Sequence, residues 1–215
     1  MYYDYMVQEL TGEINEENQG EEEIVLKNGR PIQINGGKLA IESIEFEGSR
    51  ENAKDYSFKR IFENGLIGDL GKNEFNKNVS FDIPQGSYKP AKITLNLNSR
   101  DSANGLMLNG AYNSPVFEET QLKFAFFKNH EPIEIKIQNT KGNNKVLFKK
   151  GKNKALNIKI NLNQLFAILN PKKLEEADIT HEENTRKIII SREQNGELYY
   201  DLVNRIDKSI KAILK

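Results

Sequence analysis

Residue types suited to acid–base or metal chemistry are scarce in this sequence. It contains two histidines, His130 in KNHEP and His181 in DITHEEN, and no cysteine. Without cysteine there is no thiol catalysis, no cysteine-ligated zinc and no disulfide. The lack of cysteine is compatible with a reducing and with an oxidising compartment. Both histidines fall in predicted loops, so a zinc or acid–base site would need ligands gathered from elsewhere in the fold. The GxSxG, HExxH, P-loop and GxGxxG motifs are absent.

Acidic residues occur in three clusters, at Glu21–Glu23, Glu118-Glu119 and Glu175-Glu176. A glycosidase needs two carboxylates about 5–9 Å apart, one of them with a raised pKa, and no spacing here selects such a pair. The segment from Asp101 to Gly105 resembles half of a calcium loop but lacks the alternating oxygen ligands and the distal glutamate, so a hairpin turn explains it better. We therefore predict no catalytic, cofactor-binding or metal-binding residue and no cofactor.

The charge balance argues against a nucleic-acid partner. The 31 basic and 31 acidic residues give a net charge of zero, whereas a nucleic-acid protein usually shows a basic domain or face. Lysines do cluster at Lys149, Lys150, Lys152 and Lys154. That run has no interleaved aromatic residues and flanks a glycine, which favours a solvated hairpin loop.

Contact with a membrane is expected only through a lipid anchor that this chain does not carry. No apolar run approaches the roughly 20 residues that span a bilayer. The N-terminal MYYDYMVQEL lacks the basic and apolar regions of a signal peptide. These features fit a cytoplasmic protein, and they also fit an exported protein whose signal segment has been removed.

Apolar residues alternate with a period of two through most of the chain, with turn signals at intervals of about ten residues. This pattern predicts a mainly β domain, an antiparallel β-sandwich, over residues 23–170, behind a flexible acidic leader at 1–22. The tyrosines Tyr2, Tyr3 and Tyr5 lie in that leader. The expected strands centre on Ile24–Leu26, Ile32–Ile34, Leu39–Phe46, Val79–Ile83, Ile93–Leu97, Leu106–Leu108, Leu122–Phe126, Ile133–Ile137, Val146–Phe148 and Leu156–Leu162.

Three segments depart from simple alternation. The Asn35-Gly36-Gly37 sequence predicts a turn. The parity of the apolar positions switches between Ile41 and Ile44, which predicts a bulge or strand break near Glu42-Ser43. The stretch 49–73 is irregular, and we expect a connection with a short strand or one helical turn.

Helical periodicity appears twice. The segment 163–170 predicts a short helix that Pro171 ends. Residues 171–215 form a C-terminal extension with a strand at Ile188–Ile190 and an amphipathic helix from Gly196 to Leu214, with Asn195 as a plausible N-cap. The apolar stripe of this helix should pack on the sandwich, and a surface for a partner or a membrane is the alternative.

The stretch FDIPQGSYKPAKITLNLN (81–98) has a structural explanation. Pro84 withholds a backbone donor and ends a strand, and Gly86 permits positive φ at a corner. Tyr88 can lay its ring over the sheet edge while its hydroxyl bonds upstream backbone, as a tyrosine corner does. No ligand is required by any of these residues.

Four segments carry a resemblance to a known group: GGKLAIESIEFEGSRE, VSFDIPQGSYKPAKITLNL, LMLNGAY and KALNIKINLNQLFAIL. They resemble uncharacterised putative lipoproteins of Bacteroidota over roughly residues 32–170. The resemblance implies a transthyretin-like or immunoglobulin-like sandwich at the cell envelope, on the outer membrane or in the periplasm. It assigns no catalytic residue, and this chain departs from it in lacking a lipobox cysteine.

These observations favour a non-enzymatic envelope protein with a binding, structural or adhesive role and a protein or glycan partner at the cell surface. A glycan-acting enzyme with carboxylates on loops is one alternative. A pilus or surface-assembly subunit that exchanges a strand is another.

Overall fold

The computed structural model describes residues 8–13, 22–26, 29–72, 74–97, 105–114, 118–126, 132–182 and 185–215 of the chain. Within these ranges the fold is mainly β with three helices, which confirms the predicted class at that level. The strands belong to one sheet with the order β1-β11-β14-β9-β6-β3-β7-β8-β13-β12, and β2, β4, β5 and β10 pair beside this path. Their bounds are β1 Gln8–Glu13, β2 Glu22–Val25, β3 Pro31–Arg50, β4 Tyr56–Asp69, β5 Glu74–Phe75, β6 Gly86–Leu97, β7 Leu106–Ser114, β8 Glu118–Phe126, β9 Ile133–Asn139, β10 Val146–Phe148, β11 Lys154–Ile160, β12 Ile179–Glu182, β13 Thr185–Ile190 and β14 Ile210–Leu214.

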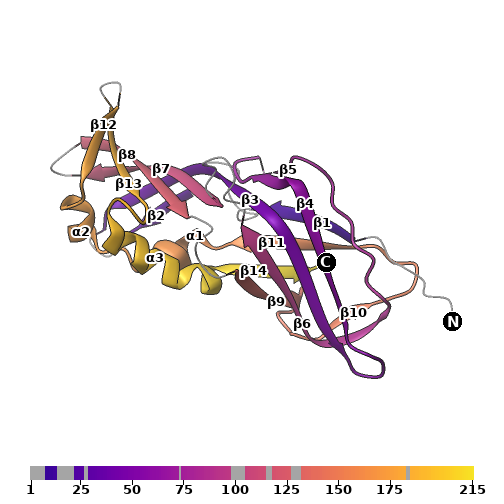
Figure 1. Ribbon diagram of the computed structural model, residues 1–215. Coiled ribbons are helices and arrows are strands. Elements are labelled where there is room, and N and C mark those ends of the chain that lie inside the picture. The colour runs from indigo at the N-terminus through magenta and orange to yellow at the C-terminus, as the bar shows by residue number, and fades with distance from the viewer. Residues whose placement is uncertain are drawn as a thin grey trace.

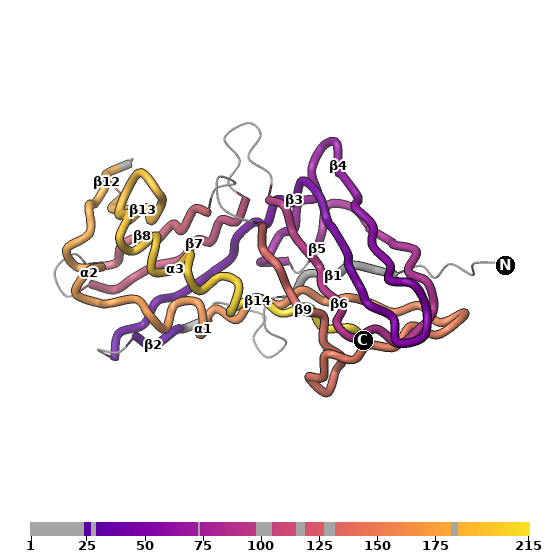
Figure 2. Tube along the Cα trace, turned by 60° about the horizontal axis from the view of Figure 1, so that its bottom comes forward, coloured from indigo at the N-terminus to yellow at the C-terminus, as the bar shows by residue number. Residues whose placement is uncertain are grey.

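The 20-residue strand β3 crosses the molecule and joins its two ends (Figure 1). Its first half pairs with β2 and β7, and the sheet continues from β7 through β8, β13 and β12. We call this part the helix end, because the helices gather there (Figure 2). The second half of β3 pairs with β4 and β6, and the sheet continues through β9, β14, β11 and β1. There the sheet curls until β1 contacts β5, so we call this part the half-barrel end.

Strand β3 pairs with strands of both ends, and its register shifts at two bulges along the way. The register shifts between Ile41 and Ser43 against both β4 and β6, which confirms the bulge predicted from parity. A second shift, between Ile34 and Gly36 against β7, lies where the sequence predicts a turn. That turn prediction is wrong: Asn35-Gly36-Gly37 is a bulge inside the strand. A Cβ on Gly37 would lie 2.2 Å from the Met107 carbonyl oxygen, so glycine allows the close approach of β7.

The pairing is mixed, whereas the sequence predicts an antiparallel sandwich. Among the described strands, three pairs are parallel: β1 with β11, β14 with β9, and β13 with β8. The strands therefore build one curled, half-barrel sheet, and two separate antiparallel layers are not clearly present. Alternation reports which face of a strand is buried and not the direction of its neighbour, which is why the parallel pairs were missed.

The predicted leader is also wrong in part. Residues 8–13 form β1, which pairs with β11 from Gln8↔Lys154 to Glu13↔Lys159. Residues 1–7, with the three leader tyrosines, and 14–21 lie outside the described residues.

The C-terminal helix is shorter than predicted. Helix α3 covers Gly196–Ser209, and the next five residues form β14 between β11 and β9. Ile210, Ala212 and Leu214 are buried, so the apolar positions of this segment satisfy a period of two as well as the helical spacing. Strand pairing on both sides decides between the two patterns, and the sequence alone carries no sign of those neighbours.

The corner motif has the predicted geometry. The buried Tyr88 hydroxyl donates to the Pro84 carbonyl oxygen at 2.7 Å, and Gly86 has a φ of +152°, which confirms the tyrosine corner. The ring lies edge-on to Phe148, with centroids 5.3 Å apart. Burial raises the pKa of Tyr88 to about 12, because the phenolate would be poorly solvated there. Ser87 to Pro90 belong to β6, and the Lys89–Pro90 peptide is cis.

The residues around the corner correct two further predictions. The irregular stretch contains β4, a strand of 14 residues, in place of a short strand or helical turn. The predicted strand at Val79–Ile83 is an irregular segment with one isolated bridge at Ser80, although Val79, Phe81 and Ile83 are buried. Phe81 stacks on Phe58 of β4, with centroids 4.9 Å apart. Alternating burial therefore arises here from packing on β4 rather than from membership of the sheet.

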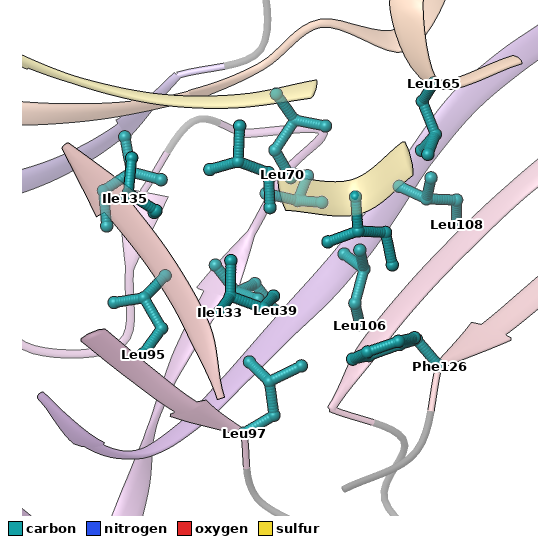
Figure 3. Packing of buried hydrophobic residues seen from close by; sticks show 14 of the residues in the cluster. Leu39, Leu70, Leu95, Leu97, Leu106, Leu108, Phe126, Ile133, Ile135 and Leu165 are labelled. Atoms are coloured by element: carbon teal, nitrogen blue, oxygen red, sulfur yellow. The ribbon is translucent and has the colours of Figure 1, made fainter. Parts of the chain in front are cut away.

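The apolar core is continuous from one end to the other. Figure 3 shows Leu39 of β3 among Leu106 of β7, Leu97 of β6 and Ile133 of β9, where the two ends meet. Among the helices that the structure describes, none has the length and apolar character to cross a membrane.

Candidate functional site

A groove of about 750 Å³ lies at the helix end, and we call it the charged groove. This volume is within the usual range for ligand sites. The start of β3, the connection between the first two helices, and α3 supply its walls. Its lining consists of Arg30, Ile168, Leu169, Asn170, Pro171, Lys172, Lys173, Glu175 and Asp201.

One wall is built around Arg30, the last residue before β3. A turn places it: the Gly29 amide donates to the Leu26 carbonyl at 2.9 Å, and the Leu26 amide donates to the Arg30 carbonyl at 2.8 Å. Arg30 Nη1 donates to Glu175 Oε1 at 3.1 Å. The same oxygen accepts a hydrogen bond from the buried Tyr112 hydroxyl at 3.4 Å. The hydroxyl and the guanidinium together hold the Glu175 carboxylate in place.

Two short helices position the floor of the groove. Helix α1 covers Leu162–Phe166, and Asn161 caps it by accepting from the Gln164 amide at 2.8 Å. Helix α2 covers Pro171–Glu175, and the Asn170 side chain accepts from the Lys172 amide at 3.0 Å. The structure confirms a short helix that overlaps the predicted range 163–170, but it ends at Phe166, so the prediction that Pro171 ends it is wrong. Pro171 instead begins α2, because the first helical turn needs no amide donor there.

The opposite wall comes from α3. Lys173 Nζ donates to Asp201 Oδ2 at 3.1 Å and lies 3.3 Å from Glu197 Oε2. These hydrogen bonds, to Asp201 first and Glu197 second, raise the pKa of the Lys173 ammonium above its usual value. The apolar side of α3 anchors this wall, since Leu198, Tyr199, Leu202 and Ile206 are buried.

Asn195 fixes the start of α3 in an unexpected way. It occupies the predicted N-cap position but has φ of +56° and makes no side-chain cap hydrogen bond. Its amide nitrogen donates to the carbonyls of Asp178 and Ile189, and its amide oxygen accepts from the Asp178 backbone. The side chain therefore ties the loop before β12 and the end of β13 to the helix.

The chemistry of the charged groove is that of a polar binding surface. Glu175 and Asp201 each accept a hydrogen bond from a cationic side chain, and both side chains are partly exposed. Ion pairs and amides offer donors and acceptors in fixed positions, a suitable arrangement for hydroxyl, amide or charged groups of a ligand.

Of the clusters noted in the sequence, only Glu175 reaches this site. Its neighbour Glu176 is exposed and lies 3.7 Å from Lys172 Nζ. His181 is exposed on the edge strand β12, and His130 and Asp101–Asn104 lie outside the described residues. Glu22 and Glu23 are in β2, Glu118 and Glu119 begin β8, and Glu21 is not described.

The lysine cluster forms a turn, as expected, but not a hairpin. The Lys152 amide donates to the Lys149 carbonyl at 3.3 Å, and Lys149, Lys150 and Lys152 are exposed. The flanking strands do not pair with each other, because β10 pairs with β6 and β11 with β14.

No sequence pattern marks Arg30, Lys173 or Asp201 as site residues. Arg30 and Glu175 are 145 positions apart, and Lys173 and Asp201 are 28 apart, so only the fold brings them together. No motif spacing could have revealed such pairs.

A second internal space is too small to be a site. It measures about 20 Å³ inside the half-barrel end and is lined by apolar side chains such as Phe46, Phe58 and Phe148. That volume would hold about one water molecule, and its apolar lining offers a water no partners. It is a packing defect of the aromatic core.

Comparison with known proteins finds nothing similar: no family model matches the chain, and no curated protein or solved structure does. Within the described ranges, no group of three or more histidine or acidic side chains is placed to hold a metal ion.

Proposed function

We propose that this protein is a non-enzymatic binding module of the cell envelope that holds a polar protein or glycan partner in the charged groove. The groove carries the proposal, because it is concave, of ligand size, and lined by side chains whose ion pairs fix their positions. Prearranged polar groups lower the ordering cost of binding and favour a particular partner.

The proposed location and finer fold rest on the resemblance. The segments within residues 32–170 resemble lipoproteins of Bacteroidota, so we place the protein on the outer membrane or in the periplasm. In this proposal the domain is a transthyretin-like or immunoglobulin-like sandwich whose layers are opposed faces of the curled sheet. Fractionation of native cells tests the location, and recovery of the full gene product in the cytoplasm alone would contradict it.

A binding screen tests the role of the groove. The wild-type protein would be offered an array of neutral and acidic oligosaccharides and the soluble proteins of the envelope. We expect retention by at least one of these, weakened at least tenfold in the double variant Arg30→Gln/Lys173→Gln. The matched control is Lys59→Gln, which breaks the Lys59–Glu45 ion pair on the half-barrel end and should bind normally. No retention, or equal retention by the groove variant, would contradict the proposal.

One observation favours the alternative of a glycan-acting enzyme: Glu175 and Asp201 line the same groove. Against it, a general acid needs surroundings that keep its carboxyl protonated, such as an apolar pocket, whereas both carboxylates here bond to cations. Assay of the retained oligosaccharides for new reducing ends separates the two ideas. Product release that disappears in Glu175→Gln would replace the binding proposal with the enzymatic one.

A further inference from the structure

Another surface pocket, distinct from the charged groove and from the small apolar cavity, lies at the opposite end of β3, beside the tyrosine corner. It has a volume of about 320 Å³, and we call it the corner pocket. Arg50 at the end of β3 and the turn residues 51–53 form one side, and the corner residues 85–87 form the other. Phe148 of β10 lines it as well and supplies an apolar surface.

Arg50 is held in a fixed position in this pocket. Its side-chain stem lies over Gly86, where a Cβ would be 3.2 Å from Arg50 Cδ. Its Nε donates to the Lys54 carbonyl at 2.7 Å, which orients the plane of the guanidinium. Among the described residues, neither terminal nitrogen of Arg50 has a hydrogen-bond partner. The outer edge of a positioned guanidinium is therefore open, and that edge suits two parallel hydrogen bonds to a carboxylate.

Ser87 contributes a second unused group. Its Oγ is the one buried side-chain nitrogen or oxygen in the described part of the chain that has no hydrogen-bond partner. The neighbouring Glu51, whose amide donates to the Ser87 carbonyl oxygen at 3.1 Å, has both carboxylate oxygens bound by Lys145 Nζ at 2.8 Å. A buried polar atom without a partner is costly, and a ligand that accepts from this hydroxyl would remove the cost.

Charge near the pocket favours an anion with a single charge. Arg50, Lys54, Lys89 and Lys145 are basic, while Glu51 and Asp55 are acidic. The basic excess attracts an anion, and the two carboxylates disfavour a second negative charge on it. A carboxylate fits this balance better than a phosphate dianion.

We propose that the corner pocket binds a small carboxylate-bearing ligand, with the outer edge of Arg50 holding the carboxylate and the Ser87 hydroxyl donating to it. Phe148 contacts the apolar part of the ligand. The site goes beyond the charged groove and does not depend on it, since the two pockets share no lining residue.

Two acid probes and their neutral analogues test the site on the full chain. D-glucuronate represents an acidic sugar and N-acetyl-aspartate amide an acidic peptide; glucose and N-acetyl-asparagine amide are the uncharged controls. Binding is followed through the backbone amide resonances of Glu51, Gly86 and Ser87. We expect saturable shifts with at least one acid and at least tenfold weaker binding of its neutral analogue. The acid that binds more tightly identifies the source of the carboxylate.

Variants locate the binding. Arg50→Gln should weaken it at least tenfold and Ser87→Ala about threefold or more, because each removes a donor. The control Arg192→Gln changes the same charge in the exposed turn before α3 and should leave the affinity unchanged. Since Ser87→Ala is nearly isosteric, it keeps the test valid even if Arg50→Gln misfolds. The proposal is overturned if neither acid gives saturable shifts, if both variants bind like the wild type, or if sulfate binds as tightly as the acids.

Discussion

At the helix end, Arg30 and Lys173 bond to carboxylates that line the same groove, whereas at the half-barrel end Arg50 keeps its outer edge free of described acceptors. The first arrangement uses charge to hold the shape of a wide surface. The second uses the backbone, through Gly86 and Lys54, to hold a charge that makes no ion pair with any described side chain. Paired charges therefore keep a binding surface in shape, whereas a positioned charge without a described partner can itself bond to a ligand. Variants at each end test whether the two ends are stabilised independently.

The largest effect is expected from Ala212→Asp in β14. Ala212 is fully buried between β11 and β9, so the new carboxylate would be desolvated without a partner. We expect a loss of about 3–5 kcal/mol in the free energy of unfolding, measured by urea denaturation with circular dichroism.

The same experiment asks whether the ends unfold together. Because β3 belongs to both, the helical signal of α3 should be lost in the same transition as the strand signal. Lys211→Asp, on the exposed side of β14, is the control and should change the stability little. A helix end that survives in Ala212→Asp would mean that the two ends are independent.

Tyr88→Phe should cost about 1–2 kcal/mol at neutral pH, because the variant leaves the Pro84 carbonyl without its buried donor. Denaturation of the variant beside Tyr200→Phe, whose ring is half exposed, isolates the hydrogen bond from the loss of a hydroxyl. Equal stabilities of the two variants would show that the corner is held by packing alone.

Alkaline pH gives a second measure of the same residue. The pKa of Tyr88 in the folded protein is about 12, whereas the pKa of an unfolded tyrosine is about 10. The folded state therefore keeps its proton longer, and stability is fully present below pH of about 10 and falls as the pH rises through this window. Wild type should lose about 2 kcal/mol more than Tyr88→Phe by pH of about 12. Parallel pH profiles of the two proteins would refute the assignment.

Glu175→Ala should have a smaller effect at the helix end, about 1 kcal/mol, because the ion pair with Arg30 is partly exposed. Thermal and urea unfolding measure it, with Glu176→Ala as the control on the outer side of α2. A cost larger than that of Tyr88→Phe would reverse the view that the corner is the more tightly held of the two.

The smallest change is expected for Lys145→Met. The hydrogen bonds from Lys145 Nζ hold the pKa of the Glu51 carboxyl below its usual value. Loss of the ammonium should raise that pKa toward normal, as measured by carboxyl resonances over an acid titration. Lys141→Met, in the same loop, should leave Glu51 unchanged, and an unchanged Glu51 in Lys145→Met would mean that the pair does not form in solution.

The sequence predicted features that depend on neighbouring residues. Alternation identified most strands, the parity switch at Ile41 identified the bulge, and the Pro84–Tyr88 motif identified the corner. Each of these is decided by local geometry and burial.

Features that depend on distant partners were missed. The apolar pattern of Ile210–Leu214 fits a helix and a strand equally well. The segment is a strand because it pairs with β11 on one side and β9 on the other. The same holds for both pockets: Arg30 meets Glu175, and Arg50 meets Gly86, through long-range pairing that no spacing encodes.

Strand β3 also sets the distance between the two pockets. It begins directly after Arg30 and ends at Arg50, so the pockets lie at opposite ends of one continuous strand of 20 residues, at most about 65 Å long. A monosaccharide or short peptide cannot bridge that length. Only a polymer with suitable groups at this separation could occupy both pockets at once, and it would gain avidity from the second contact, because the strand sets the effective concentration.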